Sequence, residues 1–224
     1  MSDREPIRVL LTGFGPFPGV RTNLSGDFLA QFETHFSPVA DNVEVRTEIV
    51  DTSWTAAEEF VANNLAVYDP HIALHFGVHR RADGFRIETR ARNRAGAHAD
   101  VDGKVFGRAQ LVSNTPPILR SNVPAAKLVQ SLQSHGLPAN PSQDAGRYLC
   151  NMLLYLSLLQ SSESGRLRQT GFIHIPQFAG PSHHKTGARR SHFDMTTLLD
   201  GTKIIVNQCI VEHRRMVQTD GSDG

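Results

Sequence analysis

Short apolar runs alternate with longer amphipathic segments along this chain, and that alternation limits the fold more than any other feature. The runs at residues 7–14, 43–50, 71–78 and 172–176 have the length and composition of strands, most of them buried. The segments between them carry apolar side chains at spacings of three and four residues, as amphipathic helices do. Because helical crossovers join parallel strands, the sequence predicts an α/β fold, a three-layer α/β/α arrangement with a twisted, mostly parallel, open sheet.

The ends of the expected helices are marked by capping residues and by glycine. Three helix N-termini are predicted at side chains that can accept a hydrogen bond from the first turn: within Thr22-Asn23-Leu24-Ser25, at Thr52 or Ser53, and at Asn122. Gly136 follows the last turn of the helix that Asn122 would begin, and glycine is common just past a helix end. A final helix is predicted from Thr196 or Thr197 to about Arg215.

Length and composition favour a single folded unit. The 224 residues contain no linker rich in serine, glycine and proline, and 39% hydrophobic with 20% charged residues is ordinary for a globular chain with a sizeable core. We therefore expect one domain over residues 1–224, with flexible ends at 1–5 and 216–224. The polar, glycine-bearing stretch from Phe178 to Ser191 is predicted to be an exposed, mobile loop.

The charge balance indicates a small partner rather than a macromolecule. The net charge is +1 and the charges are interspersed, so no broad field attracts nucleic acid or a membrane surface. The first residues do not read as a secretory leader, and no apolar run approaches the roughly 20 residues that a membrane span requires. A cytoplasmic protein whose two cysteines stay free thiols is expected. The apolar residues of the last helix fit either the core or the interface of a homo-oligomer.

Cys150 is the strongest candidate for a catalytic group. It follows a glycine-containing loop at the start of an apolar helix, where unpaired N–H groups and the helix dipole favour a thiolate. His174, at the end of a buried strand, can take the thiol proton, which predicts a nucleophile and its base. The alternative is a small core residue, the commoner role of a lone cysteine in an apolar segment. The flanking sequence favours the nucleophile.

A catalytic histidine also needs a group that orients it, and Glu88 is the candidate carboxylate. Glu88 lies between Arg86 and Arg90 in a polar, extended segment. The alternative for Glu88 is therefore a surface ion pair with one of these arginines.

Three other patterns do not lead to a defined chemistry. The glycines of residues 13–19 follow the first strand, but prolines stand where a phosphate loop needs N–H groups. Phe14 and Phe17 in that loop either pack inward or line an apolar ligand pocket. Histidines recur every fourth residue from His71 to His79, but in a predicted strand, so no metal and no other cofactor is expected. No G-x-S-x-G sequence is present, which argues against a serine hydrolase of the α/β-hydrolase type.

Three stretches match a known family in their order and spacing. They are Thr12–Asn23, with Thr-Gly-Phe-Gly-Pro-Phe-Pro-Gly and a later asparagine; Ala145–Asn151 around Cys150; and Gly171–Pro176 around His174. Together they resemble the first loop, the nucleophile motif and the histidine motif of the pyroglutamyl peptidase type I family, the pyrrolidone-carboxylate peptidases. The resemblance spans nearly the whole chain.

The resemblance implies a cysteine omega peptidase that removes an N-terminal pyroglutamyl residue from a small peptide substrate, through a thioester and without a cofactor. Cys150 would be the nucleophile, His174 the base and then the acid, and Glu88 the carboxylate that orients the histidine. Four positions are implied to bind substrate: Phe14, Phe17, Asn23 and Val78.

One departure from the family leaves the substrate open. Where bacterial members commonly have G-Q-x-G-G, this chain has residues 77–81 as Gly-Val-His-Arg-Arg, which removes a glutamine and introduces two cations. The alternatives are a divergent thiol amidase for another cyclic or N-capped acyl group, and a non-catalytic binding protein on the same fold. Activity on a panel of capped amides would distinguish the divergent amidase from a pyroglutamyl peptidase. The reactivity of Cys150 with iodoacetamide would distinguish the binding protein from an enzyme.

Overall fold

The sheet at the centre of the molecule has six strands in the order β2-β1-β3-β8-β4-β7. The computed structural model describes residues 5–16, 23–36, 38, 41–177 and 193–220. In chain order the strands of this sheet are β1 Ile7–Phe14, β2 Val43–Val50, β3 Ile72–His79, β4 Phe85–Glu88, β7 Ala139–Ser142 and β8 Gln169–Pro176. Strands β2, β1, β3 and β8 run parallel, whereas β4 is antiparallel to β8 and parallel to β7. The predicted open, mostly parallel sheet is confirmed, with two strands reversed at one edge.

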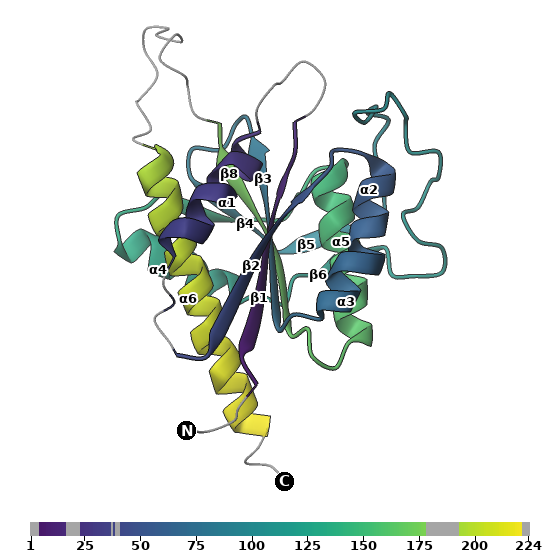
Figure 1. Cartoon of the computed structure of the whole chain (residues 1–224). Helices are drawn as coiled ribbons and strands as arrows, with labels where there is room; N and C mark the ends of the chain where they lie inside the picture. The colour runs from purple at the N-terminus through teal and green to yellow at the C-terminus, as the bar shows by residue number, and fades with distance from the viewer. Residues whose placement is uncertain (1–4, 17–22, 37, 39–40, 178–192, 221–224) are drawn as a thin grey trace, which may run out of the picture.

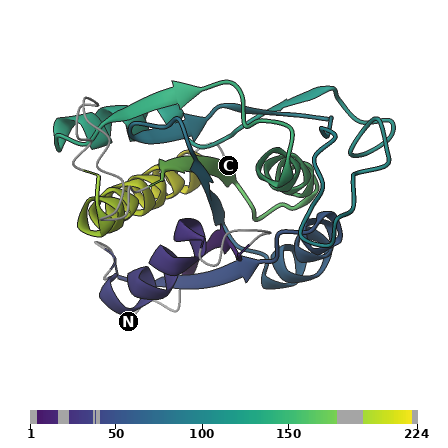
Figure 2. The same cartoon turned by 90° about the horizontal axis from the view of Figure 1, so that it is seen from above.

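Helices cover both faces of this sheet and complete the predicted three layers (Figure 1). One face carries α1 (Leu24–His35), α4 (Ala125–Ser134) and α6 (Met195–Asp220). The other carries α2 (Trp54–Glu59), a π-helical turn η1 (Phe60–Leu65), α3 (Ala66–Tyr68) and α5 (Leu149–Glu163). Two apolar clusters result, one on each face of the sheet. Seen from above, α5 and α6 lie on opposite sides of the sheet (Figure 2), and a small sheet of β5 (Arg90–Arg92) and β6 (Ile118–Arg120) lies beside α5.

A close approach fixes the first turn between strand and helix. The cap predicted within residues 22–25 is Asn23, whose side chain accepts from the N–H of Ser25. The Ser25 hydroxyl in turn accepts from the N–H of Phe14, at 3.0 Å. A Cβ at Gly13 would lie 2.0 Å from the Ser25 carbonyl oxygen, so only glycine lets β1 and α1 come this close. The end of β1 is thereby held against the start of α1.

Two predicted helix boundaries are wrong. Asn122 does not cap α4, whose N-cap is Pro124; the Asn122 side chain instead accepts from the N–H of Thr170 and donates to Ser161. The N–H of Ala125, the first helical residue, donates instead to the backbone carbonyl of Val123, at 2.8 Å. Helix α6 begins at Met195 and runs to Asp220, which makes residues 216–220 helical where a flexible end was expected. Residues 178–191 and 221–224 lie outside the described residues.

Gly136 does end α4 as predicted. Its backbone is left-handed, with a φ of 74°, and it follows the C-cap His135. In the part of the chain that the structure describes, no helix combines the length and the apolar composition needed to cross a membrane.

Candidate active site

The predicted catalytic residues converge where the parallel strands end. After β1, the chain adds β2 on one side of β1 and then crosses over to add β3 on the other side. The order of strands therefore reverses between β1 and β3, which makes this a topological switch point. Such switch points leave a crevice at the carboxyl ends of the strands, where α/β proteins bind ligands. β3 pairs with β8 along its whole length but with β1 only over Ile72–His75, so from Phe76 onward its β1 side is left without a strand partner among the described residues. The candidate site is built on that last part of β3 and on its neighbours.

Cys150 is the second residue of α5 and lies over the end of β3. Helix α5 begins after Tyr148, so Cys150 sits in the first turn, where backbone N–H groups and the positive end of the helix dipole face an anion. Its side chain is partly exposed, which gives a substrate access to the sulfur. A Cβ built on Gly77 would lie 3.1 Å from Sγ of Cys150 and 2.8 Å from Cζ of Phe172. The glycine therefore makes room for the thiol.

Glu88 and His174 are hydrogen-bonded partners on neighbouring strands. In the antiparallel pairing of β4 with β8, Arg86 is opposite His174 and Glu88 is opposite Phe172. Glu88 and His174 are thus diagonal neighbours on one face of the sheet, within reach of long side chains. Nδ1 of His174 lies 2.8 Å from Oε1 of Glu88, and their side chains are 4% and 0% exposed. The alternative of a surface ion pair for Glu88 is wrong, because this carboxylate is fully buried.

The environment of His174 favours its protonated form. Burial by itself would lower the pKa of the imidazole, but hydrogen bonds to Cys150 and to Glu88, together with their charges, outweigh burial and raise the pKa to about 9. At neutral pH the imidazole then carries the proton, and a cation beside the sulfur favours the thiolate. The second oxygen of Glu88, Oε2, is buried and has no hydrogen-bond partner among the described residues. The carboxylate is therefore directed at His174.

Asn151, next to the candidate nucleophile, ties the start of α5 to the chain that follows β5. Its Oδ1 accepts from the N–H of Arg92 at 2.8 Å, and its Nδ2 donates to the carbonyls of Arg92 and Arg94 at 2.9 and 3.0 Å. The N–H of Gly96 also donates to the carbonyl of Arg147, at 2.6 Å. No role was predicted for Asn151 from the sequence. A polar side chain in an apolar helix was the available signal, since buried amides need partners.

The four implied substrate-binding positions lie in different settings. Phe14 is 4% exposed and belongs to the cluster on the α5 face, with its ring centre 6.4 Å from that of Phe172. The Asn23 amide donates to the carbonyl of Gly15 at 2.9 Å and so holds the chain just after β1. The Val78 side chain packs against the cluster on the α1 and α6 face, the opposite face from Cys150. A side-chain contact of Val78 with substrate is therefore not supported, and only its backbone could serve. Phe17 lies outside the described residues.

The histidines spaced every fourth residue do not form a cluster. They lie along β3, with His71 just before the strand and His79 at its end, so they are spread over roughly 26 Å of extended chain. His75 is fully buried, and its Nδ1 lies 2.8 Å from the hydroxyl of Thr12. Burial lowers the pKa of His75 to about 3, so it is neutral. No group of three potential metal ligands occurs among the described residues.

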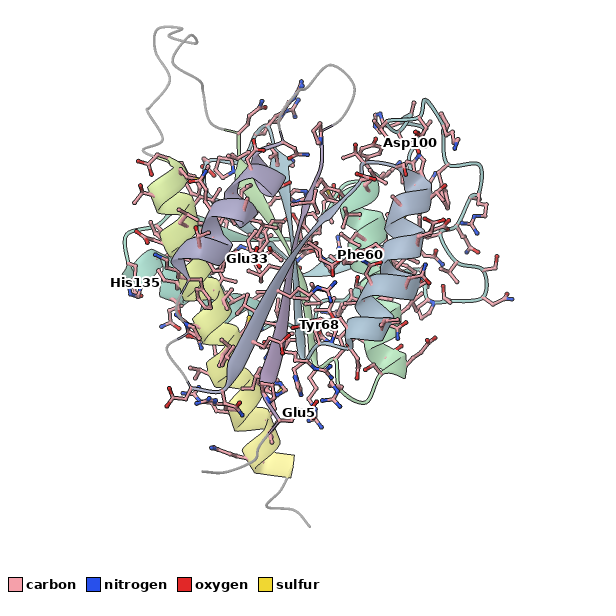
Figure 3. All side chains as sticks on the ribbon, viewed as in Figure 1. Glu5, Glu33, Phe60, Tyr68, Asp100 and His135 are labelled. Carbon is pink, nitrogen blue, oxygen red and sulfur yellow. The ribbon has the colours of Figure 1, made fainter. Side chains whose placement is uncertain are left out.

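One hollow in the described structure lies away from the candidate site. It has a volume of about 910 Å³ and lies where the parallel strands begin, between Glu5, Arg166 and the last turns of α6. Glu5, labelled in Figure 3, marks that end of the molecule. Cys150, His174 and Glu88 are at the opposite end of the strands, so this hollow is separate from the candidate site.

Replacing Gly77 with alanine is expected to lower kcat/KM by about 10²-fold, because the new Cβ pushes on both Phe172 and the Cys150 sulfur. Gly107 is the control, because a Cβ there would meet nothing within 4 Å, and Gly107→Ala should retain native activity. The measurement is steady-state kinetics of both variants and the native chain on an amide substrate. Thermal unfolding of each variant is measured in parallel. Native kcat/KM in Gly77→Ala would mean that the sulfur is not held at this glycine.

The chain is similar in sequence and in fold to known proteins of one family. Residues 7–212 match the family model described as pyroglutamyl peptidase. The chain is 31% identical to the pyrrolidone-carboxylate peptidase of Pyrococcus furiosus over 171 residues, 76% of this chain and 81% of the relative. It is 25% identical to that of Vibrio vulnificus over 227 residues, 96% of this chain and 98% of the relative. The crystal structure of the Pyrococcus furiosus pyrrolidone carboxyl peptidase superposes with a TM-score of 0.82 at 27% identity, covering 92% of this chain and 99% of that one.

Proposed function

The chain belongs to the pyroglutamyl peptidase family, and on that basis we propose that it removes an N-terminal pyroglutamyl residue from peptides, with Cys150, His174 and Glu88 as its catalytic residues. The observation that carries the assignment of residues is the buried 2.8 Å bond between His174 and Glu88 beside the Cys150 thiol. A nucleophile, a base and an orienting carboxylate are the three groups that thiol hydrolysis needs.

The first step forms a thioester. The Cys150 thiolate attacks the pyroglutamyl carbonyl carbon, and the carbonyl oxygen becomes an oxyanion. The N–H of Cys150 and an N–H from the chain after Asn93 are our candidates for its donors. The Asn151 amide supports this choice, because it holds that chain against the start of α5. As the carbon–nitrogen bond breaks, the imidazolium of His174 gives its proton to the departing amine.

The second step releases the acid. Neutral His174 takes a proton from a water molecule, and the resulting hydroxide adds to the thioester carbonyl. When the carbon–sulfur bond breaks, Cys150 leaves as a thiolate, pyroglutamic acid is freed, and the imidazolium is restored for the next cycle. Glu88 holds the imidazole in one orientation and stabilises its positive charge in both steps.

Recognition of the lactam ring is expected to depend on packing and backbone hydrogen bonds, because the ring carries no charged amine. Phe14 and Phe17 are the proposed aromatic contacts, and the Asn23 side chain holds the chain at Gly15, just after Phe14. Val78 lies in the part of β3 that extends beyond its pairing with β1. The backbone of Val78 is therefore our candidate for a hydrogen bond to the lactam ring.

The test is release of a fluorescent amine from a pyroglutamyl amide under reducing conditions. Prolyl and acetyl amides with the same leaving group serve as controls, because they lack the lactam carbonyl or the ring. Turnover of the pyroglutamyl amide alone supports the proposal. Turnover of only another capped amide would contradict the substrate and keep the thiol mechanism.

Replacing Glu88 with glutamine is expected to lower kcat/KM by about 10²-fold or more and to shift its pH dependence. Acylation needs the His174 imidazolium, so native activity should fall as the pH rises through about 9. The Glu88 hydrogen bond and charge raise that pKa, and their loss moves the alkaline limb to lower pH. Glu33→Gln, at an exposed position on α1, is the matched control. An unshifted alkaline limb in Glu88→Gln would mean that Glu88 does not act on His174.

We also propose that the enzyme works in the cytoplasm, because Cys150 and Cys209 are both free thiols. A homo-oligomer is a further expectation. Its candidate surface is the outer side of α6, where Val211 and Val217 are 41% and 49% exposed.

A further inference from the structure

A hollow lined by cations lies next to His174. Its volume is about 430 Å³, and its lining consists of His79, Arg80, Arg81, Arg86, Asp144 and Gly146. Three arginines face one aspartate in this hollow, and no step of the proposed mechanism uses them.

Two of the three arginines, Arg80 and Arg81, lie in the turn after β3, and the third, Arg86, lies in β4. Arg86 is opposite His174 in the pairing of β4 with β8, so both side chains project from the same face of the sheet. The Arg86 guanidinium donates to the hydroxyl of Ser142 at 2.9 Å, which holds it in place. Arg80 and Arg81 are exposed in the turn after β3, where the N–H of Arg81 lies 3.3 Å from Nδ1 of His79.

His79 connects this hollow to the catalytic histidine. The ring centres of His79 and His174 are 5.2 Å apart in an edge-to-face arrangement. Burial, the charge of His174 and the charge of Arg86 lower the pKa of His79. His79 is therefore uncharged at neutral pH, and it lines the hollow on the side of His174. The hollow therefore borders the group that must protonate the departing amine.

The leaving part of the substrate has to lie on the same side of the thiol as His174, because His174 must reach the departing nitrogen. The residue that follows the pyroglutamyl group is attached to that nitrogen. The side chain and the carboxyl group of that residue are only a few bonds from the departing nitrogen. Because His174 borders the cationic hollow, these groups can reach it. A concave site with excess positive charge favours a carboxylate there.

We propose that this hollow is a subsite for the leaving residue and that it selects substrates with a carboxylate on that residue, either in its side chain or at its C-terminus. The inference rests on the proposed pyroglutamyl peptidase activity and names the part of the peptide that this chain prefers. Arg80 and Arg81 supply most of the selectivity, since their exposed side chains can turn toward a bound carboxylate, whereas Arg86 is held in place by its hydrogen bond to Ser142.

The experiment compares three peptides that differ in charge and hardly in size: pyroglutamyl-glutamate amide, pyroglutamyl-glutamine amide, and pyroglutamyl-glutamine with a free C-terminal carboxylate. We expect kcat/KM for at least one carboxylate peptide to exceed that for the uncharged peptide by about fivefold, the size of a partly exposed ion pair. The preferred peptide identifies the side chain or the C-terminus as the source. The preference should shrink as salt is raised.

The double variant Arg80→Gln/Arg81→Gln is expected to reduce that ratio to below about twofold. Both positions are exposed, so the substitutions should not disturb folding. Arg214→Gln is the matched control: it removes a charge at the other end of the molecule, beside the hollow that also contains Glu5, and should keep the native ratio.

The outcomes separate the two proposals. Equal kcat/KM for all three peptides in the native chain would overturn the subsite and leave the peptidase activity in place. A carboxylate preference that survives in the double variant would also overturn it. Failure to cleave any of the three peptides would overturn the activity and the subsite together.

Discussion

Replacing Cys150 with alanine is expected to lower kcat/KM for a pyroglutamyl amide by on the order of 10⁴-fold or more. The thioester cannot form without the sulfur, and no other cysteine stands near His174. What remains is the small acceleration that binding and oxyanion donors supply. The measurement is release of a fluorescent amine under reducing conditions, with enough enzyme to detect a residual rate.

Cys209 provides the matched control for that experiment. Its side chain is fully buried in the cluster on the α1 and α6 face, and burial raises the pKa of its thiol, which keeps it protonated and unreactive. Cys209→Ala should retain activity, at the cost of a small core cavity. Iodoacetamide should modify the native chain and Cys209→Ala once, and leave Cys150→Ala unmodified. A variant without Cys150 that still turned over substrate would end the thiol mechanism.

Replacing His174 with glutamine is the second substitution with a large expected effect, a loss in kcat/KM on the order of 10³-fold. Glutamine can still donate a hydrogen bond to Glu88, whereas alanine would leave a buried carboxylate with no partner and destabilise the fold. The variant lacks the proton donor for the departing amine and the cation that favours the Cys150 thiolate.

Two readouts distinguish this role from a structural one. Alkylation of Cys150 at neutral pH should slow in His174→Gln, because less thiolate is present, while thermal unfolding should change little. His135→Gln, at an exposed position just after α4, is the matched control (Figure 3). Turnover in His174→Gln within tenfold of the native rate would assign the base to another residue.

The long parallel strands were predictable from local pattern, whereas the short strand β7, with the sequence Ala-Asn-Pro-Ser, was not. β2 spans Val43–Val50 as predicted, because an eight-residue run of strand-forming residues between turns has few other uses. The helix caps at Asn23 and Ser53 were likewise visible, since a cap bonds to its own first turn. Asn122 has the same chemistry but bonds to Thr170, 48 positions away, and local pattern carries no information about such a partner.

The candidate catalytic residues could be named from the sequence, but their arrangement could not. Glu88 could be nominated from the sequence, yet its burial depends on β4 lying antiparallel beside β8, a pairing between positions 86 apart. The opposite case is Val78, whose side chain points to the other face of the sheet because alternate residues of a strand face opposite ways. Asn151 was not found, because its partners belong to a segment 57 to 59 residues earlier in the chain.

The reversed strand β4 also affects how the molecule acquires activity during folding. Helices and the turn between β1 and α1 depend on neighbours in sequence, and contacts of that kind form early. Glu88 meets His174 only after a loop of 86 residues has closed and β4 has docked on β8. A chain that has its helices but lacks this docked strand holds the thiol without its oriented base. Recovery of turnover during refolding therefore marks completion of the sheet, later than recovery of helical content.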